Sequence, residues 1–127
     1  VLLCKDVEKV KKIAKKYGVL DRVILPGFTV NPYSWMAQAE LTVLSSDYEG
    51  LSMALVESLI CGTPVVSTDC DYGPSEILTG DMAKFLSPCG DSSALAENIR
   101  KALCAPLQVT DAPILQEVTM EKAVEQY

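Results

Sequence analysis

The chain of 127 residues contains no histidine. Without an imidazole, a Ser-His-Asp triad, a Cys-His nucleophile pair and a His-ligated metal are all excluded within these residues. The cysteines are odd in number, widely spaced and without a C-x-x-C pair: Cys4, Cys61, Cys70, Cys89 and Cys104. This pattern favours reduced thiols in a cytosolic protein over a disulfide framework or a zinc site.

Positive charge is absent from most of the chain. No Lys or Arg occurs between Val23 and Ala83, and residues 23–127 hold four basic and fourteen acidic residues. Residues 1–22 hold seven basic and three acidic ones, so the net charge is -6. Phosphate contacts are made mainly by cations, so a nucleic-acid groove in the acidic part is excluded.

Long apolar runs are missing as well. No run approaches the roughly 18 residues that a membrane span needs, and the N-terminus is not a signal peptide. Hydrophobic residues make up 49% and charged residues 22%, which is ordinary for a globular protein. The length suits one domain with a core, and the opening "VLL" without Met suggests a piece of a longer chain.

Short apolar runs alternate with helical patterns. Strands are predicted at 1–3, 22–27, 41–46, 64–68 and 83–87, and helices at 5–16, 32–39, 50–61, 74–78, 91–103 and near 119–127. A loop that contains proline is predicted at 105–113, and residues 105–117 are the candidate linker. Strands alternating with helices predict an α/β fold, a doubly wound parallel sheet of Rossmann-like type.

The ends of two predicted helices carry recognisable signals. Gly62, with Pro64 just beyond it, ends the helix at 50–61, and Asp91 is an N-cap for the helix that follows it. Lysines line one face of the helix at 5–16. That face is typical of a solvated surface, and contact with anionic lipid is the alternative.

In parallel sheets of this kind, ligands bind beyond the carboxyl ends of the strands. Two loops are predicted there, "SSDYEG" after the strand at 41–46 and "TDCDYGPSE" after the strand at 64–68. Glu49 therefore stands at the rim of a predicted ligand site. Glu57 follows on a helix whose neighbouring residues, Val56 and Leu59 among them, are apolar, and a buried carboxylate needs a partner.

The stretch from "LPGFTVNPYSW" through "SSDYEGLSMALVESLICGTPVVSTD" to "GPSEIL" resembles the donor-binding half of retaining glycosyltransferases with the GT-B fold, family 4 or group 1. The shared features are a Glu-x7-Glu motif at Glu49 and Glu57, the following "CGTPVV", and the Gly-Pro-Ser-Glu turn. "GDSSALAENIRKAL" and "MEKAVEQY" are similar to the closing helices of that family. The style is that of bacterial hexosyltransferases of polysaccharide and lipopolysaccharide biosynthesis.

This resemblance implies that residues 1–127 are a nucleotide-sugar (donor) binding domain. It would bind a UDP-hexose in preference to a GDP-sugar. Glu57 would accept hydrogen bonds from the ribose hydroxyls. Glu49, as the catalytic carboxylate, would hold the sugar and the distal phosphate together with the backbone N–H groups of Gly50, Leu51 and Ser52. Eight helical residues span roughly 12 Å, which matches the separation of sugar and ribose.

The resemblance also implies which partners the protein has, and that a metal ion is not among them. The glycan acceptor would bind an N-terminal domain outside these residues, and this chain alone would be inactive. No metal cofactor is expected, because GT-B enzymes use none and Asp69-Cys70-Asp71 lies in a loop. A cytoplasmic location is expected. Peripheral contact of the protein with the inner face of the membrane stays open as an alternative.

Three departures from the family pattern stand out. The Arg and Lys that clamp the diphosphate have no counterpart in residues 23–83, and the glycine-rich turn after "VLL" is replaced by "CKDVE", where Lys5 is a poor substitute. The acceptor domain is not within these residues. Two alternatives therefore stay open: half of a GT-B sugar-nucleotide epimerase, and a non-catalytic binding module that kept the fold.

Overall fold

The computed structural model describes residues 1–4, 6–105, 109 and 112–117. It divides into two compact units, Val1–Pro32 and Tyr33–Tyr127. The helix predicted near 119–127 and the residue Lys5 lie outside the described residues.

The first unit is built on helix α1, Val7–Lys16. Its N-cap is Asp6, whose side chain accepts a hydrogen bond of 3.0 Å from the backbone N–H of Lys9. Such a cap satisfies one of the N–H groups that a helix start leaves unpaired. Just beyond the helix, Gly18 has a φ of 65°, so the predicted C-terminal stop is confirmed. A short 3₁₀ turn, η1 at Leu20–Arg22, follows.

The strands predicted at 1–3 and 22–27 are wrong. These segments share one backbone hydrogen bond, from Leu2 N–H to the Ile24 carbonyl at 3.0 Å, and neither forms a ladder. Leu2 and Ile24 are both exposed within the structure. An isolated pair of strands that buries little apolar surface is not stable enough to form a ladder.

The second unit contains a three-stranded parallel sheet in the order β1-β2-β3. The strands are β1 at Thr42–Leu44, β2 at Val65–Asp69 and β3 at Leu86–Pro88. Thr42 pairs with Val65, and Ser67 pairs with Leu86. The predicted α/β class with a parallel sheet is confirmed, and β1 and β3 form its two edges.

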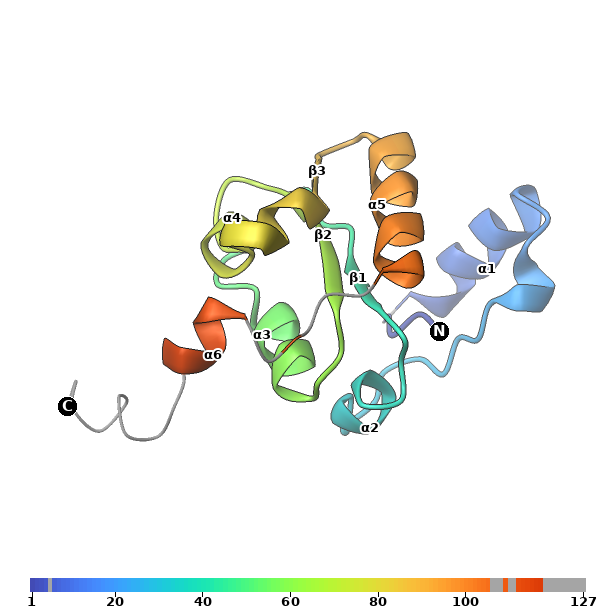
Figure 1. Ribbon diagram of the computed structural model, residues 1–127. Coiled ribbons are helices and arrows are strands. Elements are labelled where there is room, and N and C mark those ends of the chain that lie inside the picture. The colour runs from blue at the N-terminus through green and yellow to red at the C-terminus, as the bar shows by residue number, and fades with distance from the viewer. Residues whose placement is uncertain (5, 106–108, 110–111, 118–127) are drawn as a thin grey trace. The chain divides into compact units, whose positions relative to one another are not determined.

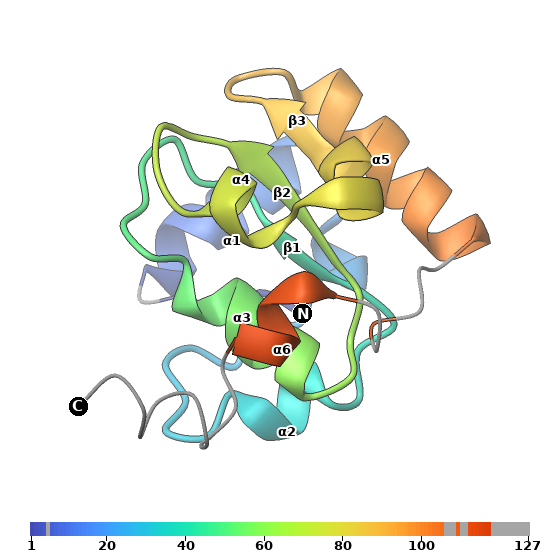
Figure 2. The ribbon, with the colours of Figure 1, turned by 60° about the vertical axis from the view of Figure 1, so that its left-hand side comes forward.

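Helices cover both faces of this sheet. Figure 1 shows α3, α4 and α6 on one side of β2 and α5 on the other, and Figure 2 shows the same arrangement after a rotation. The helical segments of this unit are α2 at Tyr33–Met36, α3 at Met53–Ile60, α4 at Pro74–Ile77, the 3₁₀ helix η2 at Gly80–Phe85, α5 at Ser92–Cys104 and α6 at Pro113–Glu117.

The central strand explains the two layers. Adjacent residues of a strand point to opposite faces, and in β2 both Val65 and Val66 are buried. Val65 belongs to the larger apolar cluster, which includes Leu55 and Leu59 of α3 and Ile77 of α4. Val66 belongs to a second apolar cluster, together with Phe85 of η2 and Ala102 of α5. A strand covered on both faces is the mark of a parallel α/β sheet.

Three predicted boundaries need correction. The helix predicted from residue 50 begins at Met53, and Ser52 is its N-cap. The strand predicted at 83–87 starts as the 3₁₀ helix η2, because Met82 and Phe85 are both buried and their spacing of three matches one 3₁₀ turn. Helix α6 lies in the stretch predicted as loop or linker.

No helix in the described ranges combines the length and the apolar character that crossing a bilayer requires.

Candidate functional site

The carboxyl ends of the three strands meet around the loop that follows β1. The hydroxyl of Thr68, in β2, donates to the backbone carbonyl of Ser46. The Cys89 thiol, just after β3, lies 3.8 Å from the same carbonyl oxygen. The loop after β1 and the ends of β2 and β3 therefore share one edge, as the parallel order predicts.

Glu49 lies in this loop, half-buried, ahead of helix α3. Its Oε1 accepts a hydrogen bond of 2.5 Å from the hydroxyl of Ser46. The bond fixes one carboxylate oxygen, and no partner of the other is found in the described part of the chain. Ser46 was not among the predicted site residues, although its place three residues before Glu49 is a spacing at which such local bonds form.

The start of helix α3 presents unpaired hydrogen-bonding groups. Among the described residues, the backbone N–H groups of Gly50, Leu51 and Ser52 donate to no protein acceptor. The Ser52 hydroxyl is buried and finds no hydrogen-bond partner in the part of the chain that the structure describes, and Ser52 is 2% exposed. N–H groups and partial positive charge at a helix start suit an anionic group such as a phosphate.

The loop after β2 lies against this helix start through Gly73. Its φ is 89°, and a Cβ atom built there would lie 2.2 Å from the carbonyl oxygen of Gly50 and 3.0 Å from the Ser52 hydroxyl. A residue with a side chain cannot take this place unless the backbone moves. Gly73 is thus required for the two loops to meet, a role beyond the helix start that "GPSE" predicts.

Glu57 lies on α3 and is half-buried, whereas the apolar neighbours in the sequence predicted a buried side chain. The predicted need for a partner is met by Tyr33, whose hydroxyl donates to Oε1 of Glu57 at 3.2 Å. This hydrogen bond, and then the charge of Glu57, raises the pKa of the Tyr33 phenol above its ordinary value of 10.0. The sequence carries no signal for this pair, which is 24 residues apart.

The predicted spacing of the two glutamates along one helix is wrong. Only Met53–Ile60 is helical, so Glu49 precedes the helix and the estimate of roughly 12 Å does not apply. Glu49 is held before the helix and Glu57 on its second turn.

The charge at this edge is negative. The pKa of the Cys89 thiol is raised, first because it loses part of its water shell, and then because of the nearby Cys70, Asp47, Asp69 and Asp71. In the described part of the chain, no three Asp, Glu, Cys or His side chains converge as ligands for a metal. Residues 23–83 also contribute no cation that could offset this charge.

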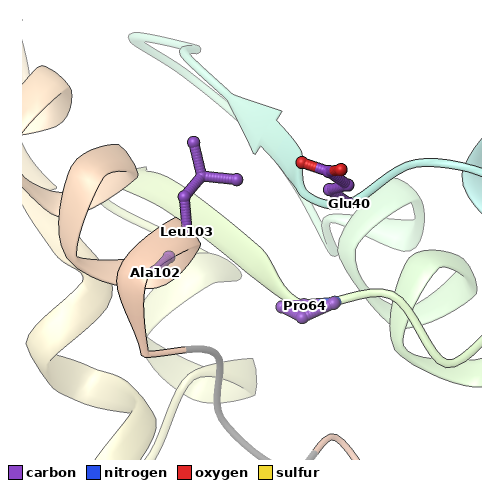
Figure 3. Close-up of a pocket in the computed structure, with 4 residues that line it drawn as sticks. All are labelled: Glu40, Pro64, Ala102 and Leu103. Carbon is purple, nitrogen blue, oxygen red and sulfur yellow. The ribbon is translucent and has the colours of Figure 1, made fainter.

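A separate hollow of about 420 Å³ lies at the opposite edge of the sheet. Figure 3 shows its lining, with Glu40 and Pro64 just before β1 and β2, and Ala102 and Leu103 in α5. Because Glu40 and Pro64 come just before β1 and β2, the hollow is at the amino ends of these strands. It therefore does not include either glutamate of the candidate site.

Known proteins resemble this chain over most of its length. A transferase of Campylobacter jejuni, N-acetylgalactosamine-N,N'-diacetylbacillosaminyl-diphospho-undecaprenol 4-alpha-N-acetylgalactosaminyltransferase, is 32% identical over 105 residues, 81% of this chain and 29% of its own. The lipopolysaccharide 1,6-galactosyltransferase of Escherichia coli is 27% identical, over 82% of this chain and 30% of its own. The chain thus spans under a third of these relatives.

Solved structures agree on the fold. The TarM protein of S. aureus, in complex with Fondaparinux, alpha-GlcNAc-glycerol and UDP, superposes with a TM-score of 0.81 at 23% identity, over 95% of this chain and 26% of that one. The lipopolysaccharide outer core galactosyltransferase WaaB superposes with a TM-score of 0.80 at 22% identity, over 94% of this chain and 36% of that one.

The family model for glycosyl transferases group 1 matches residues 4–112. Together with the parallel sheet and its similarity to GT-B structures, this match shows that the chain belongs to the glycosyl transferases group 1 and carries a Rossmann-like part of the GT-B fold.

Proposed function

We propose that residues 1–127 form the donor-binding domain of a retaining glycosyltransferase that moves a hexose from a UDP-sugar to a glycan acceptor. The observation that carries the proposal is the edge where Glu49 and Glu57 flank the start of α3, with the unpaired N–H groups of residues 50–52 between them. A diphosphate and its sugar supply the anion and the hydroxyls that such an edge can bind.

Each residue then has a distinct role. Glu57 accepts hydrogen bonds from the ribose hydroxyls, and the N–H groups of Gly50, Leu51 and Ser52 receive the distal phosphate. Glu49 binds the sugar hydroxyls and stabilises the positive charge that develops as the glycosidic bond to the phosphate breaks. The buried Ser52 hydroxyl gains a partner when the phosphate is present.

Acceptor binding and neutralisation of the diphosphate require residues other than those of this chain. The acceptor binds another part of the protein, since this chain matches under a third of its relatives. The cations that neutralise the diphosphate also come from elsewhere, because the loops at this edge are acidic. Metal ions have no role in this scheme, and the UDP in the TarM complex supports a uridine nucleotide.

The test is to incubate the intact protein with a panel of UDP- and GDP-hexoses and glycan acceptors. Transfer of one hexose with its anomeric configuration retained is expected, with UDP released. Conversion of the donor to its epimer without transfer would instead make the protein an epimerase. Binding of a nucleotide sugar without either reaction would leave only a binding module.

A further inference from the structure

Glu57 is held by a residue from a distant part of the second unit. Tyr33 opens helix α2, and its hydroxyl donates to Oε1 of Glu57 at 3.2 Å. The Tyr33 side chain is half exposed and Glu57 is half-buried, so the pair lies at the surface where a ligand can reach it. In the described part of the chain, Oε2 of Glu57 has no hydrogen-bond partner.

Helix α2 is anchored next to α3, and this fixes where the phenol lies. The Thr63 hydroxyl donates to the carbonyl of Met36 at 2.6 Å, at one end of α2. At the other end, the thiol of Cys61 lies 4.0 Å from the carbonyl of Tyr33. Both anchors belong to the turn that follows α3. A four-residue helix has little stability of its own, so these contacts determine its position.

The protonation of the phenol suits a fixed geometry. The hydrogen bond to Glu57 raises the pKa of Tyr33, so the phenol keeps its proton and remains a donor at neutral pH. A glutamate side chain on a helix surface otherwise samples several rotamers, and ordering it on ligand binding costs free energy. A bond already made in the free protein removes part of that cost.

We propose that Tyr33 is a positioning residue that holds Glu57 ready for the donor, with Oε1 occupied by the phenol and Oε2 left for a ligand hydroxyl. This inference rests on the proposed function, in which Glu57 binds the ribose. Tyr33 acts through Glu57 and does not itself contact the reacting atoms.

The experiment measures UDP binding by calorimetry in the intact protein and in the variants Tyr33→Phe, Glu57→Gln and the double variant. Tyr33→Phe keeps the ring and removes the hydroxyl, so UDP affinity should fall about threefold to tenfold. In the Glu57→Gln background the same change should have less than about a twofold effect, because the group it positions is gone. Tyr17→Phe removes a phenol hydroxyl from an exposed ring of the first unit and is the matched control.

Each other outcome has a definite meaning. If the intact protein binds no UDP, the proposed function fails and this inference fails with it. If Glu57→Gln weakens UDP but Tyr33→Phe does not, only the role of Tyr33 is wrong. Tighter UDP binding by Tyr33→Phe would show that the phenol competes with the ligand, and an equal loss in both backgrounds would show that it acts independently of Glu57. Thermal unfolding separates these results from a loss of folding, since Tyr33→Phe should unfold near the temperature of the Tyr17→Phe control.

Discussion

The proposed function gives the two glutamates different parts of the donor to bind, so substitutions at Glu49 and Glu57 should have different effects. Glu57→Gln keeps the shape and removes the charge that strengthens a hydrogen bond to a ribose hydroxyl. We expect the affinity for UDP to fall about tenfold. Glu49→Gln should leave UDP affinity unchanged and reduce binding or turnover of the intact UDP-sugar, because the ligand proposed for Glu49 is the sugar.

Calorimetry of the intact protein with UDP and with UDP-sugar makes this comparison. The matched control is Glu97→Gln, which removes a carboxylate from α5 whose partner is the exposed Arg100. If both site variants bind UDP as the unmodified protein does, the two carboxylates are structural and the site is wrongly assigned.

Gly73 is a second residue with a sharp prediction. Its positive φ and the close approach of Gly50 O leave no room for a methyl group. Gly73→Ala should lower the free energy of unfolding by roughly 1–3 kcal/mol and disturb the start of α3. Denaturant unfolding measures the first effect, and UDP binding measures the second.

Gly90→Ala is the control for backbone strain alone. Gly90 also has a positive φ, of 76°, but a Cβ there meets nothing within 4 Å. A larger loss for Gly73→Ala would therefore report the collision with the neighbouring loop. Equal losses would show that the two loops can separate at little cost.

At the scale of the element, α5 depends on its N-cap. The Asp91 carboxylate accepts a hydrogen bond of 2.9 Å from the N–H of Ala94. Asp91→Ala should lower the free energy of unfolding by about 1 kcal/mol, as the loss of a capping side chain does. Ser93→Ala, an exposed change in the first turn of the helix, should have a much smaller effect, and an equal effect would show that the cap contributes nothing.

Much of the fold could be predicted from local patterns, and what could not has physical causes. The central strand and the helix from Asp91 follow from an apolar run and a cap, both set by neighbouring residues. The strands at 1–3 and 22–27 were predicted from apolar runs alone, but a strand also needs a partner, which a local pattern does not supply.

The candidate site also has residues that could be predicted from the sequence and residues that could not. The sequence placed Glu49 and the following residues at a strand end, because loop position follows from the order of strands and helices. It could not supply Tyr33 or the contact of Gly73 with Gly50, because both depend on segments distant in the chain. Helix α3 starts later than predicted, because Gly50 and Leu51 belong to the loop and Ser52 is the N-cap.

The role of metal ions in the intact protein is open to a direct test. The reaction proposed here uses carboxylates and N–H groups, and the described residues offer no cluster of three metal-binding side chains. Transfer by the intact protein should therefore persist in EDTA. Loss of activity on chelation, restored by manganese, would show that Asp69 and Asp71 bind a metal after all.

Residues 1–127 alone should not transfer sugar. The chain matches under a third of its relatives, and its candidate site is acidic where a diphosphate needs cations. Purified residues 1–127 should give no detectable transfer from UDP-hexoses to glycan acceptors, measured beside the intact protein as the positive control. Measurable transfer would show that these residues contain an acceptor site.

The position of β1 at the edge of the sheet has a consequence for handling this chain in solution. On its outer side β1 presents N–H and C=O groups that no other strand in the described sheet pairs with. A strand edge without a neighbouring strand can recruit the edge of another molecule, and Val43 of β1 is exposed. Isolated residues 1–127 should therefore self-associate as their concentration rises, and amide hydrogens in β2 should exchange with solvent more slowly than those on the outer side of β1.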